Sequence, residues 1–227
     1  MESIVGQPIE FEVLVHAQWT PTAHLAATFR SGRVFVIGDA AHALPPSMGM
    51  GANLAIADAH NLAWKLAWVL DGRAGAGLLD SYDPERRPVD AFILERSIIE
   101  MDWSVKQFDE ATAMIGLGYP PASSPAMIGE STGMPIRDPH DSGPEVRMRV
   151  PHHWLIDGRS TLDLANSNTF AAVGIMDAGI TEIPYGNIPG SPTAPQRVWL
   201  IRPDGHIAAH VPAEEIASTI DWILERH

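Results

Sequence analysis

The sequence predicts an α/β protein, and three observations support this fold class. The chain of 227 residues is 45% hydrophobic and only 19% charged, which provides enough apolar material for a packed core. A β-branched run at 33–38 is followed by a glycine-rich loop and then by a stretch with helical spacing. Short strand-like runs and one more helical stretch return near the C-terminus. We therefore expect a strand–loop–helix unit and a smaller second unit.

Composition excludes several classes of function. The formal net charge is −13, with 28 acidic and 15 basic side chains, which disfavours nucleic acid as a partner. No apolar run approaches the roughly 20 residues that cross a bilayer, and the first residues do not follow the pattern of a signal peptide. We expect a cytoplasmic protein without a membrane partner. Because cysteine is absent, disulfides, thiolate nucleophiles and cysteine zinc sites are excluded.

The first elements are predicted to be strands. Residues 9–19 alternate apolar and polar side chains, which is the pattern of a half-buried strand. Residues 33–38 are β-branched and almost continuously apolar, which is typical of a strand covered on both faces. From 38 to 53 the chain contains too many turn residues for a helix or strand, so we expect a loop.

Two helices are predicted after this loop. Apolar residues recur at helical spacing from Asn53 to Leu70, and Asp71-Gly72 ends that helix. Asp83-Pro84-Glu85 supplies the cap, proline and first-turn acid of a second helix, whose amphipathic pattern runs to Phe108. The first helix follows the loop directly, which is the order of a ligand-binding α/β unit.

The rest of the chain is predicted to form a linker and a second unit. Residues 116–150 are rich in Gly, Pro, Ser and Asp, so we expect a linker between a unit at 1–115 and a smaller one at 151–227. In the smaller unit, strand signals occur at 161–164, 170–173 and 198–201, a turn at 203–205, and a last helix from about 213 to 225. Residues 180–196 are expected to form a loop.

The segment from Gly38 to Asn53 is the candidate ligand site. Gly38 lets a ligand approach the backbone, and the carboxylate of Asp39 can accept hydrogen bonds from vicinal hydroxyls of a polyol or ribose. Gly49 and Gly51 let the chain pass close to a flat ligand. The free amides at the following helix start favour an anion or an electron-rich carbonyl. These residues alone predict a small-molecule site.

Order and spacing make the prediction more specific. The run reads Gly38-Asp39-Ala40-Ala41-His42, Pro45-Pro46, Gly49-Met50-Gly51-Ala52-Asn53 and Asp58-Ala59-His60-Asn61-Leu62-Ala63-Trp64-Lys65. It resembles the second FAD motif of group A flavoprotein monooxygenases, and most closely the branch of polyketide and phenol hydroxylases. The resemblance continues at 78–88 and returns at 158–164 and 201–206. It covers the C-terminal part of such an enzyme, because no Gly-x-Gly-x-x-Gly run precedes these motifs.

The resemblance implies a fold, a cofactor and a reaction. The fold would be a partial FAD-binding hydroxylase fold with a shortened thioredoxin-like C-terminal domain. FAD, reduced by NADPH, would hydroxylate an aromatic or polyketide substrate, and no side chain is nominated as an essential acid or base. The implied cofactor-binding residues are Gly38, Asp39, Pro46, Gly49, Met50, Gly51, Ala52 and Asn53.

The resemblance also implies roles for these residues. Asp39 would hold the ribityl hydroxyls, and Pro45-Pro46 would shape the loop near the reacting face. The backbone from Gly49 to Asn53 would surround the pyrimidine edge, where the amides of Ala52 and Asn53 stabilise negative charge on the reduced flavin.

Several hypotheses about the whole protein stay open. Without a cradle for the ADP half of FAD, we expect this chain alone to bind flavin weakly or not at all. It would then be a C-terminal portion, one subunit of a split enzyme with a complementary N-terminal subunit, or a reused scaffold. A non-redox cyclase or isomerase is one alternative. A protein that dimerises or docks to a partner through exposed sheet edges is another.

Three other residues have both a structural and a functional interpretation. His42 could be a general base, but a structural histidine is favoured. Arg86 and Arg87 could bind phosphate, but ion pairs with Glu85 and Asp90 are favoured.

Seven further residues could have structural roles. The pair His152-His153 lacks a third ligand, so no metal is predicted. Ser160 is expected in a turn. Met48 and Met50 suit either an adaptable apolar wall or the core, and Trp64 and Trp68, one helical turn apart, are interpreted as packing.

Overall fold

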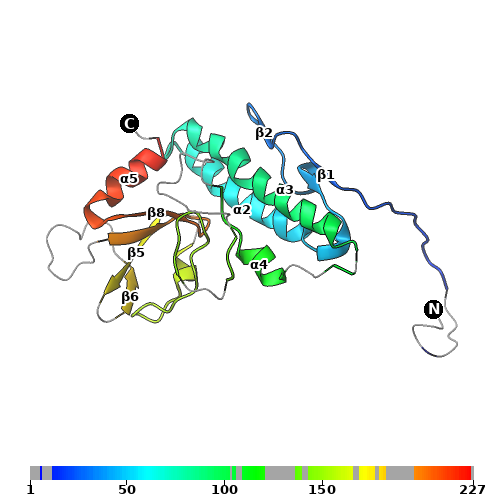
Figure 1. The fold of residues 1–227 in the computed structure, drawn as a ribbon. Helices are drawn as coiled ribbons and strands as arrows, with labels where there is room; N and C mark the ends of the chain where they lie inside the picture. The colour runs from blue at the N-terminus through cyan, green and yellow to red at the C-terminus, as the bar shows by residue number, and fades with distance from the viewer. Residues whose placement is uncertain are drawn as a thin grey trace.

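The computed structural model describes residues 6, 12–102, 104–105, 109–120, 136–139, 143–165, 169–176, 179–182 and 197–225. Two long helices, α2 (Gly51–Leu70) and α3 (Tyr82–Ile99), run side by side through the middle of the molecule (Figure 1). The short helix α4 (Glu110–Ile115) lies beside this pair. A β-sheet and helix α5 (Ile216–Ile223) lie at one end of the pair. None of the described helices is both long and apolar enough to span a bilayer.

Two small antiparallel strand pairs precede α2. Strand β1 (His24–Leu25) pairs with β4 (His42–Ala43), and β2 (Arg30–Ser31) pairs with β3 (Val34–Phe35); both pairs are antiparallel. The short 3-10 turn η1 (Gly38–Ala40) lies between β3 and β4, and a second one, η2 (Pro46–Met48), lies between β4 and α2. The segment from 38 to 53 is therefore not a plain loop, because it contains two 3-10 turns, a short strand and the start of α2.

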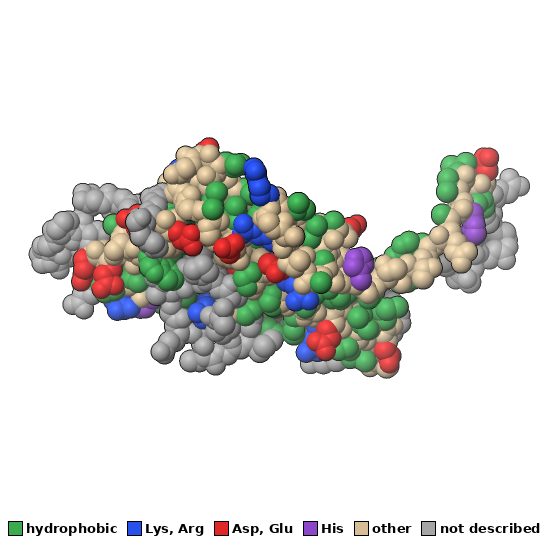
Figure 2. All heavy atoms as spheres, turned by 90° about the horizontal axis from the view of Figure 1, so that it is seen from above, with side chains coloured by type: hydrophobic (Ala, Val, Ile, Leu, Met, Phe, Trp, Pro, Cys, Tyr) green, Lys and Arg blue, Asp and Glu red, His purple; other side chains and the backbone are tan. Residues whose placement is uncertain are grey.

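The two strand predictions for the N-terminal part were wrong over the described residues. Residues 12–23 are extended and exposed, and they form no strand; Figure 2 shows this segment standing away from the body. Of the run at 33–38, only Val34 and Phe35 form a strand, and Val34 is 66% exposed instead of covered on both faces. Alternation describes how side chains point, but a strand also needs a neighbour that completes its hydrogen bonds, and the described residues offer residues 12–23 none.

Helix α2 matches its prediction closely. It begins at Gly51, two residues before the expected start, and ends at Leu70, where the amide of Asp71 bonds back to the carbonyl of Ala67. Its buried face carries the apolar side chains of Leu54, Leu62, Trp64 and Trp68. It also carries three polar side chains, those of Asp58, Asn61 and Lys65. Ile56 and Leu70 lie on the exposed face.

Helix α3 starts and ends earlier than predicted. The 3-10 turn η3 (Ala76–Ser81) leads into it, so Asp83 lies inside the helix and accepts a hydrogen bond from the amide of Phe29 instead of capping. Pro88 therefore lies beyond the first turn. The helix ends at Ile99, short of the expected Phe108, which lies outside the described residues. The carboxylate of Asp102 just beyond accepts the amide of Ser104, a local turn that competes with continued helix.

The C-terminal unit is a four-stranded antiparallel sheet with strand order β6-β5-β7-β8. Its strands are β5 (Ala171–Met176), β6 (Gly179–Glu182), β7 (Arg197–Ile201) and β8 (Ile207–Pro212), and the turn η5 (Ala213–Glu215) leads into α5. Two of the predicted strands, the turn and the last helix are confirmed. The predicted strand at 161–164 is instead the 3-10 turn η4 (Thr161–Leu164), because Ser160 and Asp163 form a capping box. Strand β6 lies in a segment that was expected to be loop.

One hydrophobic cluster joins the helices to this sheet. The rings of Trp64 and Trp68 meet edge to face with centroids 5.3 Å apart, and both contact Phe170 beside β5. The same cluster continues into α5 through Ile216, Ile220 and other buried residues. The interpretation of the tryptophan pair as packing is confirmed, and α2 shares its core with the sheet.

Candidate functional site

The Gly38-Asp39 corner combines a fixed backbone with a free side chain. Gly38 is buried and has a positive φ of 55°, and a Cβ at this position would lie 3.0 Å from the Cβ of Ala55. Its amide donates a 3.0 Å hydrogen bond to Oδ2 of Asp58 in α2. The side chain of Asp39, by contrast, is exposed. The corner therefore needs glycine, and it presents a carboxylate to the outside.

The start of α2 is open and uncapped. Leu54 is the first residue whose amide bonds within this helix, to the carbonyl of Met50 at 3.0 Å. Among the described residues, no side chain caps the helix and its first turn holds no acid. The amides of Gly51, Ala52 and Asn53 thus keep the partial positive charge of a helix start.

The glycines beside this helix start leave space for a ligand. Gly49 has a φ of 64°, and nothing lies within 4 Å of a Cβ built at Gly49 or Gly51. Open space, free amides and the exposed carboxylate of Asp39 fit a flat, electron-rich ring system that carries a polyol chain. The residues present therefore fit FAD at its flavin and ribityl end.

The loop residues between these two points differ in exposure. Pro46 is exposed at the start of η2, and the hydroxyl of Ser47 donates to the carbonyl of Ser97 in α3. Met48 is half-buried, whereas Met50 is buried in a cluster with Leu54, Ile93 and Ala113. Of the two interpretations considered for these methionines, Met50 belongs to the core.

A first group of buried charges lies directly behind the loop. Asp58 accepts hydrogen bonds from Nε of Arg86 at 2.8 Å, and its other oxygen lies 2.8 Å from Nε2 of His42. Nη2 of Arg86 donates to Asp90 one helical turn along α3, at 2.6 Å. Each side chain of this group is at most 4% exposed. Asp58 therefore connects the Gly38 corner, α2 and α3.

The two acids of this group are held in different protonation states. Burial raises the pKa of Asp58, but the hydrogen bond from His42 and the charge of Arg86 outweigh it and hold that pKa below its usual value. For Asp90, burial prevails over the charge of Arg86, the charge of Asp58 adds to it, and the pKa rises to about 8. Arg86 thus faces one firmly ionised carboxylate and one that holds a proton at neutral pH.

A second group of buried charges ties the helices to the sheet. Oε2 of Glu85 accepts from Nζ of Lys65 at 2.8 Å, and Oε1 accepts from Nη1 of Arg202 at 2.8 Å. Arg202, in the turn between β7 and β8, also pairs with Asp204. The amide of Asn61 donates to Glu85 at 2.7 Å. This group holds two positive and two negative charges, so the ions balance.

Pairing decides the protonation of this second group. Burial alone would raise the pKa of Glu85, but the charges of Arg202 and Lys65 lower it to about 2. Burial lowers the pKa of Lys65 to about 8, although Glu85 opposes that change. Glu85 is therefore firmly ionised and holds two cations from separate parts of the chain.

The sequence interpretation of these side chains was partly right. The pairing of Arg86 with Asp90 and the structural interpretation of His42 are confirmed, but Glu85 pairs with Lys65 and Arg202 instead of Arg86. Arg87 donates to the carbonyl of Ala26.

Two places in the structure bear on metal binding. His42, Asp58 and Asp90 lie close enough to hold a metal, with ligand atoms within 4.8 Å, but Arg86 already donates to both acids. The ring of His152 packs against Trp154.

Sequence reasoning missed Asp58, Asn61 and Lys65 as an ionic face of α2. A signal was present, because these polar residues are spaced by three and four positions within an otherwise apolar helix.

A cleft of about 230 Å³ lies beside the same helix. It is bounded by α2, α3 and α4, and by the chain near Tyr119, Arg149 and His206. Asn53 and Met50 lie at the end of the cleft that adjoins the open start of α2. The loop and the cleft are therefore adjacent.

Sequence comparisons connect the chain to flavoproteins. The family described as "FAD binding domain" matches residues 2–97. The tetracenomycin A2 monooxygenase-dioxygenase of Streptomyces glaucescens is 39% identical over 183 residues, which cover 77% of this chain and 32% of that protein. Aklavinone 12-hydroxylase of Streptomyces peucetius is 35% identical over 200 residues, covering 83% of this chain and 39% of that enzyme.

Structural comparisons agree. A structure of aklavinone-11 hydroxylase with FAD and aklavinone aligns with a TM-score of 0.74 and 27% identity, covering 92% of this chain and 46% of that one. The rebeccamycin biosynthetic enzyme RebC with reduced flavin aligns with a TM-score of 0.69 and 30% identity, covering 93% and 49%. The chain thus spans less than half of each relative named here. The expected fold, a partial hydroxylase fold of mixed helix and strand, and the resemblance based on residues 38–65 are confirmed.

Proposed function

We propose that this chain, a relative of the FAD-dependent hydroxylases of aromatic and polyketide compounds, is the flavin-contacting portion of such a monooxygenase. The observation that supports the proposal is the uncapped start of α2 beside the exposed carboxylate of Asp39. Similarity to the FAD binding domain family covers the same residues. The substrate would be an aromatic or polyketide molecule.

Each residue of the loop has a proposed task. Bound FAD, reduced by NADPH, would supply the oxygen chemistry. The carboxylate of Asp39 would accept hydrogen bonds from the ribityl hydroxyls, while the amides of Ala52 and Asn53 would donate to the pyrimidine edge. These amides are fixed before the ligand arrives, so they need no reorganisation to stabilise negative charge there. Gly49, Gly51 and Pro46 would keep the approach to that edge open.

We also propose that a complementary segment or subunit covers the exposed apolar side chains of the helical unit. Val13, Leu14, Val15 and Trp19 of the extended segment, and Ile56 and Leu70 of α2, are each at least 64% exposed. Such side chains gain stability when a partner buries them. The partner would carry the site for the ADP half of FAD, and a homodimer is the alternative. The assembly would work in the cytoplasm, where NADPH is available.

The division of the chain gives its two units different tasks in this proposal. Residues 1–115 would contact the flavin, residues 116–150 would link the units, and residues 151–227 would serve as a scaffold. The pairing of Arg202 with Glu85 supports the scaffold role, because it fixes α3 from the side of the sheet.

A visible-absorption titration with FAD tests the proposal. The purified chain should perturb the flavin bands on saturable binding, and Asp39→Ala should weaken that binding about tenfold, which corresponds to the loss of about 1.4 kcal/mol. Asp157→Ala, which removes an exposed carboxylate of the C-terminal unit, is the matched control and should bind as the unaltered chain does. Saturable flavin binding that Asp39→Ala leaves unweakened would overturn the proposal.

A further inference from the structure

The corner at Gly38 is tied to α2 through one carboxylate. Within the part of the chain that the structure describes, the hydrogen bonds that join residues 38–42 to this helix both end on Oδ2 of Asp58. The amide of Gly38 donates to this oxygen at 3.0 Å, and Nε2 of His42 lies 2.8 Å from it. A single side chain of α2 therefore holds the turn that carries Asp39.

The corner meets α2 close to the free amides of the helix start. A Cβ at Gly38 would lie 3.0 Å from the Cβ of Ala55, so the backbone of the corner rests directly on the helix. Ala55 and Asp58 are three residues apart and share one face of α2, and Ala52 precedes Ala55 by the same spacing. The corner thus meets the helix about one turn, or roughly 5 Å, beyond the free amide of Ala52. The two parts of the proposed flavin site are neighbours along one helix face.

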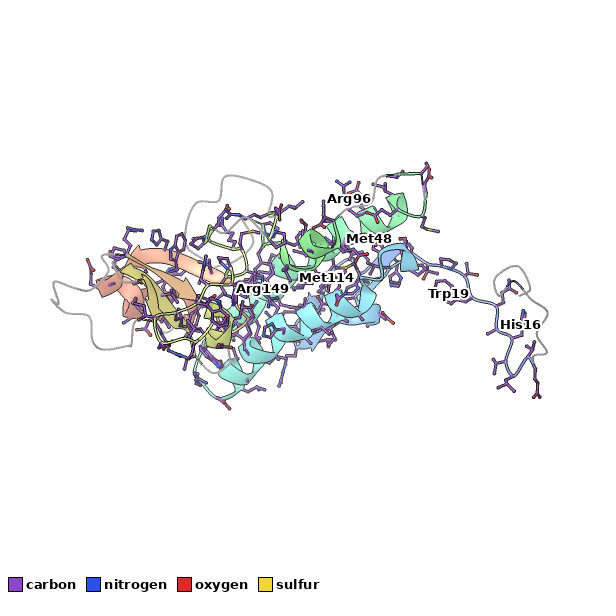
Figure 3. The ribbon with its side chains drawn as sticks, turned by 90° about the horizontal axis from the view of Figure 1, so that it is seen from below. His16, Trp19, Met48, Arg96, Met114 and Arg149 are labelled. Atoms are coloured by element: carbon purple, nitrogen blue, oxygen red, sulfur yellow. The ribbon has the colours of Figure 1, made fainter. Side chains whose placement is uncertain are left out.

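The middle of the loop is held by the other long helix. Figure 3 labels Met48 there, and the hydroxyl of the preceding residue, Ser47, donates to the carbonyl of Ser97 near the end of α3. The middle of the loop is thus bonded to α3, whereas the corner is bonded to α2. The bond from Gly38 to Asp58 is therefore the polar contact that relates the corner to the start of α2.

The carboxylate of Asp58 is both ionised and fixed in orientation. Its Oδ1 accepts from Nε of Arg86 at 2.8 Å, while Oδ2 receives Gly38 and His42. The side chain is fully buried. Burial works against ionisation, but the hydrogen bond from His42 and the charge of Arg86 hold the pKa of Asp58 below its usual value. Because both oxygens are occupied, the carboxylate cannot turn without losing a charge-assisted bond.

We propose that Asp58 is a positioning residue for the flavin, because its carboxylate holds the amide of Gly38 and thereby fixes Asp39 relative to the open start of α2. Asparagine at position 58 would keep the shape but would offer one oxygen, and its NH₂ group would face a donor that now binds the carboxylate. The inference rests on the proposed function in taking the flavin as the ligand. The bond to Gly38 belongs to the flavin-free chain and can be measured there.

Amide hydrogen exchange of the flavin-free chain, followed by NMR, tests this bond. The amide of Gly38 should be protected, and Asp58→Asn should make it exchange at least about tenfold faster, as expected for the loss of a hydrogen bond to a charged group. If the unpaired Arg86 prevents this variant from folding, Asp58→Asn combined with Arg86→Gln removes both charges and tests the same bond. Unchanged exchange at Gly38 in the folded variant would overturn the proposal.

The substitution Asp83→Asn is the matched control for this measurement. In α3, Oδ1 of Asp83 accepts the amide of Phe29 at 2.9 Å, so the same substitution breaks the same kind of bond away from the corner. Asp83→Asn should speed exchange at Phe29 and leave Gly38 protected, whereas Asp58→Asn should do the reverse. Equal loss of protection at Gly38 in both variants would contradict a specific tie through Asp58.

Titration with FMN, followed by visible absorption, tests the role of Asp58 toward the flavin. Asp58→Asn should weaken FMN binding by about fivefold or more, and Asp83→Asn should leave it unchanged. In a chain that already carries Asp39→Ala, Asp58→Asn should weaken FMN by less than about twofold, because a positioning residue acts through the group that it positions. Losses that multiply fully in the double variant would rule out this role, since Asp58 would then act without Asp39.

The same titrations separate this proposal from the proposed function. FMN binding that is weakened by Asp39→Ala but not by Asp58→Asn would overturn the role of Asp58 and leave the proposed function intact. FMN binding that neither variant weakens would overturn both proposals, and faster exchange at Gly38 would then identify Asp58 as a tie within the fold alone.

Discussion

The buried face of α2 and its open N-terminus follow opposite rules. On the buried face, Asp58, Asn61 and Lys65 are fully buried, and each has a hydrogen-bond partner in α3 or in the preceding strand β4. At the N-terminus, no described side chain caps the helix, and nothing lies within 4 Å of a Cβ built at Gly49 or Gly51. A buried charge is tolerated only when it is paired. The ionic face of α2 can therefore pack against α3 in only one register. Helix α2 is therefore fixed by its middle, and its start can stay free for a ligand.

Removing the central acid should have the largest effect. Glu85→Gln would leave Lys65 and Arg202 buried without their shared countercharge, so we expect a loss of about 3–5 kcal/mol in the free energy of unfolding. Urea denaturation followed by circular dichroism measures this loss. The control is Glu95→Gln, an exposed position on the same helix, which should change stability by less than about 0.5 kcal/mol. Similar losses in both variants would show that the ionic face does not hold the helices.

The second-largest effect should come from a substitution at Gly38. Gly38→Ala places a Cβ at a φ of 55° and 3.0 Å from Ala55. The left-handed backbone alone costs about 1–2 kcal/mol for a residue with a side chain. The same urea experiment measures this loss in the free energy of unfolding. Flavin affinity should also fall, because Gly38 positions the neighbouring carboxylate of Asp39. An unchanged free energy of unfolding would contradict the tight packing of this corner on α2.

The protonation of Asp90 gives a pH-dependent test. Burial raises the pKa of Asp90 to about 8, so the folded chain holds a proton that the unfolded chain loses above about pH 4. The stabilisation from this proton is complete below about pH 4 and disappears as the pH rises through about 8. The Asp90→Asn variant has no carboxyl group that titrates at this position, so it does not lose this stabilisation as the pH rises.

The measurement for Asp90 is the difference in free energy of unfolding between the variant and the unaltered chain. This difference should move in favour of Asp90→Asn by at least about 1 kcal/mol between pH 5 and pH 8, since one pKa unit corresponds to about 1.4 kcal/mol. A difference that stays constant over this range would contradict a protonated Asp90.

The smallest effect should come from the open end of α2. Gly51→Ala meets no atom within 4 Å and lies in helical backbone, so it should stabilise the flavin-free chain by about 0.5–1 kcal/mol. The added methyl group would occupy space proposed for the flavin, so flavin affinity should fall while stability rises. A variant that gains stability and binds flavin normally would place the flavin elsewhere.

The sequence predicted the helices better than the strands. Local signals determine where α2 ends and that Ser160 caps a turn, and the pairing of Arg86 with Asp90 follows from their spacing within one helix. Residues 12–23 alternate like a strand, but alternation does not say whether a neighbouring strand exists.

The candidate site was predictable only where it depends on residues that are adjacent in the sequence. The motif indicated the loop from Gly38 to Asn53, because its glycines and its helix start are adjacent in sequence. The pair of Glu85 and Arg202 joins residues 117 positions apart, and no local pattern identifies such a partner. The cleft likewise depends on segments that only the fold brings together.

We propose that this chain contacts the flavin and ribityl end of the cofactor and not the ADP end. Titration with FMN and with FAD, followed by visible absorption, tests it directly. We predict weak, saturable binding of both, with affinities that agree within about threefold, or less than about 1 kcal/mol. A preference for FAD of about tenfold or more would contradict the claim, because it would show that the chain binds the ADP half as well.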